Sequence, residues 1–257
     1  MNVDMSSSHA YYRNPQTRSR VLGTIRSYLG LHREGAEAKE ARNEKYAEMI
    51  NAYYDLVTDF YERGWGRSFH FAPRKEGESF AASLARHEHY LALRLGLGAG
   101  QRVLDVGCGV GGPMRAIASF SGATVDGVNN NDYQLAKLAR YNDEASLAHL
   151  CRGFKGDFMA LDVPEATYDA AYEVEATCHA PDKQKIFRAI KPGGLFAGYE
   201  WCLTDRFDGS DPEHVRTKRA IEEGNSLPDI ASVPDVRRAL EGAGFEVIEI
   251  ADLALAS

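Results

Sequence analysis

The sequence is poor in cysteine and has no long apolar run. No stretch of about eighteen apolar residues is available to span a bilayer, and the opening residues MNVDMSSSHAYY lack the apolar core of a secretory signal. We therefore expect no transmembrane segment, and only peripheral contact with a membrane. No CxxC pair and no metal-ligand spacing occurs, so we expect no metal site and reduced thiols at Cys108, Cys151, Cys178 and Cys202.

An excess of positive charge is also absent. The chain has 30 Lys and Arg against 37 Asp and Glu, a formal net charge of −7. Such a chain is poorly suited to a phosphate backbone, so nucleic acid is not an expected partner. The 257 residues contain no internal repeat or low-complexity tract and are enough for one large domain, or for one domain with an appendage.

Helical periodicity dominates the first part of the chain. Residues 1–35 are polar and are expected to be loosely ordered. Residues 36–100 are expected to be helical and rich in aromatic side chains. Apolar side chains recur there at steps of three and four, which predicts a long helix ending near Gly64 and a second helix over Phe80–Leu95.

Strands and helices alternate over residues 101–257, which form the second expected region. Alternation of this kind predicts parallel strands with right-handed crossovers, and hence a three-layer α/β sandwich. Helices are predicted over Gly111–Ser121 and Asp132–Asn142. Strands are predicted over Arg102–Val106, Ala123–Asn129, Gly153–Phe158, Tyr168–Ala176, Leu195–Leu203 and Phe245–Ile250.

The sharpest local pattern is VLDVGCGVGG at residues 103–112. An apolar strand leads into three alternate glycines, Gly107, Gly109 and Gly111, and then into a helix. Glycines allow a tight turn and let a ligand approach the backbone closely. The helix N-terminus that follows offers unpaired N–H groups to a carboxylate.

Two cofactors fit this turn. Gly107, Gly109 and Gly112 match the dinucleotide fingerprint, and Asp126 lies near the distance expected for an acid that binds ribose. Asp105 argues against that interpretation, because its carboxylate would repel a pyrophosphate and attract the α-ammonium group of a sulfonium cofactor. We therefore favour S-adenosylmethionine. A glycine-rich turn without a ligand is the third interpretation.

Polar side chains follow at the ends of the later strands. Asn129 ends the second strand, where its amide is placed to bond ribose hydroxyls. Asp157 ends the third strand and is placed to accept from the adenine amino group, and Glu175 ends the fourth. Because open α/β sheets bind ligands at their carboxyl edge, we expect these three side chains to bind the cofactor together with Asp105 and the glycines.

Longer motifs resemble one family. They are YYDLVTDFYE at 53–62, GWG and SFHF within 64–71, RHEHYLA at 86–92, NNNDYQ at 129–134, EATCHAP at 175–181 and YEW at 199–201. With residues 104–113 they resemble the sterol C24-methyltransferases, the fungal members most, over roughly residues 46–253. The resemblance implies a class I S-adenosylmethionine-dependent methyltransferase with a Rossmann-like sandwich.

The resemblance also implies a reaction, the methylation of C24 in a zymosterol-like Δ24-sterol during ergosterol-type biosynthesis. The alkene attacks the sulfonium methyl, a cation forms at C25, a hydride shifts from C24, and a base removes a proton to leave a C24 methylene. Aromatic faces stabilise a cation without capturing it. Tyr54, Trp65 and Phe69 are therefore expected at the site, whereas Phe60 and Val57 are expected to pack in the core.

Several side chains are candidates for the base. Glu175 and His179 lie at the carboxyl end of the fourth predicted strand, next to the expected position of the methyl group. His70, His89 and Asp132 are further candidates, and the pattern does not choose among them.

The chain departs from the family in three places. Arg63 stands where the family has an aromatic residue, so it either points to solvent or impairs a cation site. The crossover at 182–191 is shorter by about four residues, roughly one helical turn. The chain ends at Ser257, whereas the family continues with segments that close the sterol cavity. The sheet is therefore expected to be incomplete, with Phe245–Ile250 as its sixth strand beside a gap or an exposed edge.

The sequence leaves three possible functions. The first is a sterol methyltransferase, with or without impairment by truncation. The second is methyl transfer to another lipid, and the third is a non-catalytic fragment that binds the cofactor or partner subunits. The expected partner is a sterol, and self-association is left open. The expected location is peripheral, at the cytoplasmic face of the endoplasmic reticulum or on a lipid droplet.

Overall fold

The computed structural model describes residues 22–23, 25–26, 28–30, 40, 43–182 and 190–253. The loose order expected for residues 1–35 concerns residues that are mostly outside these ranges. The crossover helix expected before Lys191 also lies outside the described residues.

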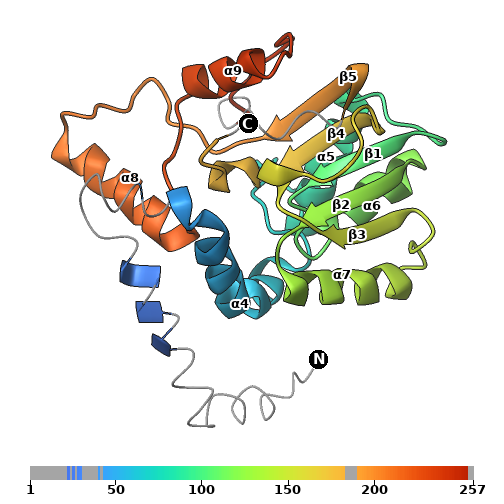
Figure 1. Cartoon of the computed structure of the whole chain (residues 1–257), viewed down its shortest axis with the longest axis horizontal. Coiled ribbons are helices and arrows are strands. Elements are labelled where there is room, and N and C mark those ends of the chain that lie inside the picture. Colours follow the sequence, from blue (N-terminus) through green and yellow to red (C-terminus); the bar gives the residue numbers. More distant parts are fainter. Residues whose placement is uncertain are drawn as a thin grey trace.

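Five parallel strands form the central sheet (Figure 1). β1 (Arg102–Val106) lies in the middle between β2 (Thr124–Asn129) and β4 (Tyr168–Val174). β3 (Cys151–Lys155) and β5 (Ile190–Tyr199) flank them, in the order β3-β2-β1-β4-β5. The predicted α/β sandwich with parallel pairing is confirmed.

Three helices share a buried core on one face of this sheet. They are α5 (Phe80–Arg94), α6 (Gly112–Ser121) and α7 (Asp132–Glu144). Leu91 of α5 and Met114 of α6 belong to the same buried cluster as Val103 of β1. The expected boundary at residue 100 thus lies between α5 and β1, although α5 packs into the core of the sheet. The division into two regions stays a prediction.

The second cluster occupies the other face, where Leu240 of α9 (Val233–Gly242) packs against a buried group that includes Leu104 and Val106. Figure 1 places α4 (Tyr46–Trp65) and α8 (Pro212–Asn225) on the side of the sheet to which the strand arrows point. These two helices therefore lie where an open parallel sheet binds its ligand. No helix in the described ranges is long and apolar enough to cross a membrane.

The position of Phe60 corrects a prediction. Phe60 was expected in the core, but it is 66% exposed. Its helix, α4, turns Tyr54, Thr58 and Tyr61 inward, at spacings of three and four. Phe60 lies off this inward-facing stripe, so it faces solvent.

The predicted sixth strand at Phe245–Ile250 is wrong. The structure has no strand at these positions, and Ile248 is 77% exposed. Phe245 packs on Phe196 of β5 with 6.1 Å between ring centroids. The apolar alternation thus buries one end of the segment, but a strand also needs a neighbouring strand that satisfies its backbone groups. Within the described residues β5 is the edge of the sheet.

This arrangement predicts fast amide exchange at the segment. The amides of residues 245–250 should exchange at least about a hundredfold faster than that of Leu104, which lies on a central strand with neighbours on both sides. Hydrogen–deuterium exchange with mass spectrometry measures both peptides in one experiment. Equal protection of the two segments would show that 245–250 is paired in solution.

Candidate active site

The glycine turn after β1 takes left-handed backbone conformations, with φ of 79° at Gly107 and 52° at Gly109. A Cβ built on Gly107 would lie 2.5 Å from the Cβ of Ala176. A Cβ on Gly109 would meet nothing within 4 Å, and Gly109 borders a cavity. The turn therefore excludes side chains and leaves bare backbone open to a ligand.

The first cavity lies at the carboxyl edge of the sheet and has a volume of about 640 Å³, including the open space at its mouth. Gly107 and Gly109 line it from the turn, Asn129 from the end of β2, Glu175 from the end of β4 and Tyr54 from α4. Four of the predicted cofactor residues are therefore brought to one wall. We refer to this space as the glycine-side cavity.

Asp105 is not on that wall. Its side chain is buried behind the turn, 2% exposed, and accepts a hydrogen bond of 2.9 Å from the Tyr172 hydroxyl. Burial raises the pKa of Asp105 to about 7, against the lowering effect of Tyr172. Direct contact between Asp105 and a cofactor stays a prediction.

Two further predicted cofactor residues also lie away from the wall. Gly111 caps the N-terminus of α6 and packs against Leu138. Asp157 caps a short helix, where its Oδ1 accepts from the Met159 N–H at 2.8 Å and from the hydroxyl of Tyr46. Contact between Asp157 and an adenine stays a prediction.

Asp126, the acid that a dinucleotide-binding turn would need for its ribose, bonds an arginine instead. Asp126 is 4% exposed, lies within β2 rather than at its end, and accepts from Nε of Arg102 at 2.8 Å. It lines neither cavity. A ribose-binding role for Asp126 therefore has no support in this arrangement.

Sequence reasoning missed Gln134 on the wall of the glycine-side cavity. Its Oε1 accepts from the Asn129 amide at 2.8 Å, and its Nε2 donates to the Thr58 hydroxyl at 3.1 Å. The spacing in the sequence could have indicated it. Gln134 is the third residue after the helix cap Asn131, and so lies in the first turn of the helix that begins beside the end of β2. Gln134 thus fixes the Asn129 amide and joins it to α4.

A second cavity, of about 440 Å³, adjoins the first and is walled by aromatic rings. Trp65 meets Phe71 edge to face with ring centroids 5.8 Å apart, and Phe71 meets Trp201 at 5.6 Å. Trp65 and Phe69 were predicted here, whereas Trp201 was noted only within the YEW motif. We call this the aromatic cavity; its full lining is Tyr54, Tyr61, Trp65, Phe69, His70, Phe71, Glu175, Cys178, His179, Trp201, Asn225 and Leu227.

The two cavities meet at side chains that line both. These are Tyr54, Phe69, His70, Glu175 and His179. Four of the five catalytic residues predicted from the sequence are among them, and the fifth, Trp65, lines the aromatic cavity alone. The two cavities are therefore neighbours, and these five side chains form the boundary between them.

Glu175 ties two walls of the site together. Its Oε1 accepts from the Phe71 N–H at 2.9 Å, and its Oε2 accepts from the Trp201 indole at 2.9 Å. Its backbone has φ of 54°, a conformation rare for a residue with a side chain and typical of functional sites. Burial raises the pKa of Glu175, and the two N–H donors oppose that rise.

His70 donates from both ring nitrogens. Its Nδ1 lies 3.0 Å from the Phe71 carbonyl, and its Nε2 lies 3.1 Å from Oε1 of Glu88. Burial alone would lower the pKa of His70, but these two bonds outweigh it and raise the pKa. Both ring nitrogens are thus engaged by protein oxygens, and neither is directed at a substrate.

The segment that carries His70 lies close on the glycine turn. A Cβ on Gly112 would lie 1.9 Å from the Arg67 carbonyl oxygen, and the Ser68 hydroxyl donates to Glu88 at 2.6 Å. Residues 67–71 therefore form a strap over the start of α6. Glu88 and Glu175 hold its two ends.

Other candidates lie away from both cavities. His89 stacks on Phe120 at 4.3 Å, and Asp132 pairs with Lys155 with 74% of its side chain exposed. Arg63 was predicted either to point to solvent or to impair a cation site. It is exposed and lines neither cavity, so it points to solvent.

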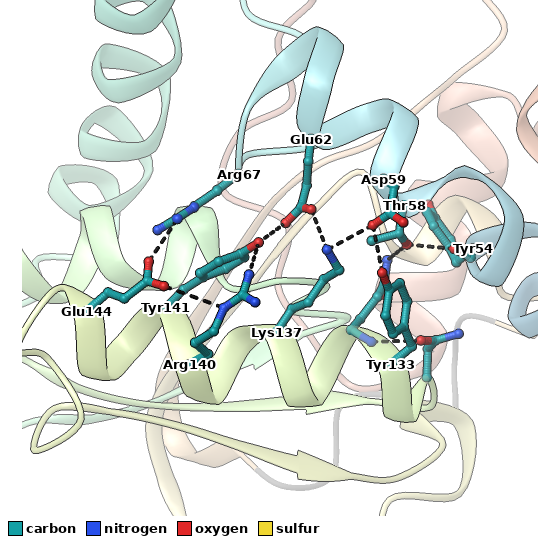
Figure 2. Close-up of polar contacts among 12 residues, drawn as sticks. Tyr54, Thr58, Asp59, Glu62, Arg67, Tyr133, Lys137, Arg140, Tyr141 and Glu144 are labelled. Atoms are coloured by element: carbon teal, nitrogen blue, oxygen red, sulfur yellow. Dashed lines mark hydrogen bonds and ion pairs between the residues drawn. The ribbon is translucent and has the colours of Figure 1, made fainter. Parts of the chain in front are cut away.

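The seating of α4 on α7 is polar (Figure 2). Lys137 lies between Asp59 and Glu62, at 2.8 and 2.6 Å. The Tyr141 hydroxyl donates to Glu62 at 2.5 Å, and the Tyr133 hydroxyl donates to Asp59 at 2.7 Å. These contacts hold the helix that carries Tyr54, Tyr61 and Trp65 over the carboxyl edge of the sheet.

The comparisons with known proteins agree with this geometry. Residues 103–194 match a family model described as a methyltransferase domain. Cycloartenol-C-24-methyltransferase of Arabidopsis thaliana is 50% identical over 241 residues, 92% of this chain and 72% of that protein. Sterol 24-C-methyltransferase of Saccharomyces cerevisiae is 49% identical over 245 residues, 94% of this chain and 63% of that protein.

The chain thus spans between 63% and 72% of the length of these two relatives. Plant and fungal relatives match at similar identity, so the expected closer likeness to fungal members stays a prediction.

Solved structures share the fold. Geranyl diphosphate C-methyltransferase from Streptomyces coelicolor, solved with S-adenosyl-L-homocysteine, superposes with a TM-score of 0.66 at 21% identity, over 81% of this chain and 82% of that one. The cyclase SpnF superposes with a TM-score of 0.67 at 24% identity, over 79% and 73%. The arrangement of strands and helices is the Rossmann-like methyltransferase fold.

The buried carboxyl of Asp105 predicts a pH effect on stability. Because its pKa is raised to about 7, the folded state binds more protons than the unfolded state between about pH 4 and pH 7. Its contribution to the free energy of unfolding therefore falls as pH rises through that window. In Asp105→Asn, whose amide oxygen still accepts from Tyr172, this loss should be absent. Melting temperatures of both proteins from pH 5 to pH 8 measure it, and parallel curves would contradict it.

Proposed function

The chain belongs to the sterol 24-C-methyltransferase family, and we propose that it transfers a methyl group from S-adenosylmethionine to C24 of a Δ24-sterol side chain. One observation carries the proposal. A cavity bounded by bare glycine backbone and amides meets a cavity bounded by aromatic rings, and five side chains line both. This arrangement suits a polar methyl donor on one side and an apolar acceptor on the other.

The glycine side fits the donor. When bound, S-adenosylmethionine supplies a methyl group on a positively charged sulfur. The space beside Gly109 lets the backbone approach a ligand, and Asn129, fixed by Gln134, offers an amide at the end of β2 where a ribose is expected. Tyr54 and Phe69 complete this wall with rings.

The aromatic side fits a sterol side chain. Trp65, Phe71 and Trp201 give π faces that exclude water and stabilise positive charge without forming a bond to it. The charge of Glu175 is directed into the N–H groups of Phe71 and Trp201. Each carboxylate oxygen of Glu175 therefore accepts a hydrogen bond. A carboxylate oxygen without such a donor would be expected to capture the cation by forming a bond to it.

The position of the site favours an acceptor drawn from a membrane. Phe71 lines the aromatic cavity and is 53% exposed, and Phe60 on α4 is 66% exposed. Exposed apolar rings beside a lipid site suit a peripheral contact. We place the protein on the cytoplasmic face of the endoplasmic reticulum or on a lipid droplet.

Labelled methyl transfer tests the proposal. With methyl-labelled S-adenosylmethionine, the label should enter a Δ24-sterol and should not enter the same sterol with a saturated side chain, because only the alkene is nucleophilic. Thin-layer separation and counting measure both. Calorimetry with S-adenosylhomocysteine is run in parallel.

The outcomes of that experiment separate the interpretations. Tight binding of S-adenosylhomocysteine without transfer to any lipid would contradict catalysis and support a cofactor-binding fragment. Transfer to a phenolic lipid but not to the sterol would assign another acceptor. Binding of a nicotinamide dinucleotide in place of S-adenosylhomocysteine would overturn the cofactor.

A further inference from the structure

The reaction needs a base at the junction of the two cavities. This requirement rests on the proposed function: a C24 methylene forms when a proton leaves the methyl group that has just been transferred. That methyl group lies where the donor side meets the acceptor side. Side chains that line only one cavity are therefore too far to one side, and the candidates are Tyr54, His70, Glu175 and His179.

Hydrogen bonding removes His70 from this set and gives Glu175 another role. Both nitrogens of His70 donate, to a carbonyl and to a carboxylate, so neither accepts a proton. Each oxygen of Glu175 already accepts from an N–H group that fixes part of the wall, Phe71 through Oε1 and Trp201 through Oε2. Glu175 is thus built into the structure of the site.

The remaining two side chains form a directed pair. Nδ1 of His179 lies 3.0 Å from the Ser226 carbonyl oxygen, which only accepts, so Nδ1 carries a hydrogen. In the neutral ring Nε2 then holds a lone pair. Nε2 lies 3.1 Å from the hydroxyl of Tyr54, which donates to it. The neutral ring is therefore set to receive the proton of Tyr54.

We propose that Tyr54 and His179 are the base of this site and act as a two-step relay. The C–H bond of the transferred methyl group breaks, and its electron pair forms the new C=C bond and quenches the cation. The Tyr54 oxygen takes that proton while its own proton passes to Nε2 of His179. The positive charge of the sterol cation thus ends on the imidazolium of His179, and no other reactant is needed.

Two further observations support the relay. Burial raises the pKa of Tyr54 well above its usual range, so a free phenolate does not form there, and the hydroxyl needs a partner that takes its proton. Ser226, whose carbonyl orients His179, ends α8 with φ of 57°. The carbonyl that fixes the tautomer thus belongs to a helix cap, which keeps His179 in one orientation.

Two variants remove one member of the pair each. Tyr54→Phe keeps the ring and deletes the hydroxyl, and His179→Gln keeps an acceptor for Tyr54 but cannot hold the proton. Tyr90→Phe is the matched control, because it deletes the hydroxyl of an exposed tyrosine on α5 that lines neither cavity. Thermal melting and the affinity for S-adenosylhomocysteine are measured for all three.

Product analysis gives the decisive readout. With a Δ24-sterol and trideuteromethyl S-adenosylmethionine, the wild type and Tyr90→Phe should yield the alkene with two deuterium atoms. In Tyr54→Phe and His179→Gln methyl transfer should continue, but proton loss should slow by about a hundredfold. Water then adds to the cation and loses a proton, and an alcohol that keeps three deuterium atoms should dominate.

Three results would overturn the relay. One is an unchanged ratio of alkene to alcohol in either folded variant. Another is loss of methyl transfer itself at unchanged affinity for S-adenosylhomocysteine, because a base is not needed for that step. The third is alcohol from Glu175→Gln but not from the other two variants, which would make Glu175 the base. Failure of the wild type to methylate any sterol would instead overturn the proposed function.

Discussion

Lys137 of α7 is held between two carboxylates of α4, and the site depends on this contact. Its side chain is 13% exposed and that of Glu62 is 16% exposed. Burial alone would lower the pKa of Lys137, but Asp59 and Glu62 raise it well above its usual range. An ion pair shielded from water to this degree is worth more than an exposed one, and breaking it leaves a partly buried charge.

The consequence is that polar side chains attach α4 to α7, and α4 brings the aromatic wall with it. Asp55 of α4 accepts from Asn131 at 2.8 Å, and Thr58 accepts from Gln134, which also bonds Asn129. The amide on the glycine side and the helix that bears Tyr54 are thus parts of one network. The strap at 67–71, bonded to Glu88 and Glu175, holds the other end of the aromatic wall.

The sequence predicted those parts of the site that depend on local geometry. The glycine turn, Asn129 and Glu175 were found because strand ends in a parallel sheet meet at one edge. Phe60 was misplaced because periodicity alone does not tell which of two adjacent stripes on α4 faces inward. Residues 245–250 have the alternation of a strand, but strand formation depends on a neighbour that periodicity does not report.

Pairings between distant residues were beyond the reach of the pattern. Tyr54 and His179 are 125 residues apart, and both were candidates. The direction of their hydrogen bond, however, is set by the Ser226 carbonyl at the end of α8. The two histidine candidates illustrate the same limit. His70 differs from His179 only in its partners, and those partners decide that one ring donates twice while the other accepts.

The most direct test of the account is the affinity for S-adenosylhomocysteine after Lys137→Met. Lys155→Met is the matched control, since Lys155 forms an exposed pair with Asp132 near the same helix. If the seating of α4 creates the cofactor cavity, calorimetry should show at least about tenfold weaker binding in Lys137→Met, roughly 1.4 kcal/mol, and no change in the control. Equal affinity in both variants and the wild type would show that α4 keeps its place without this contact, and would contradict the account.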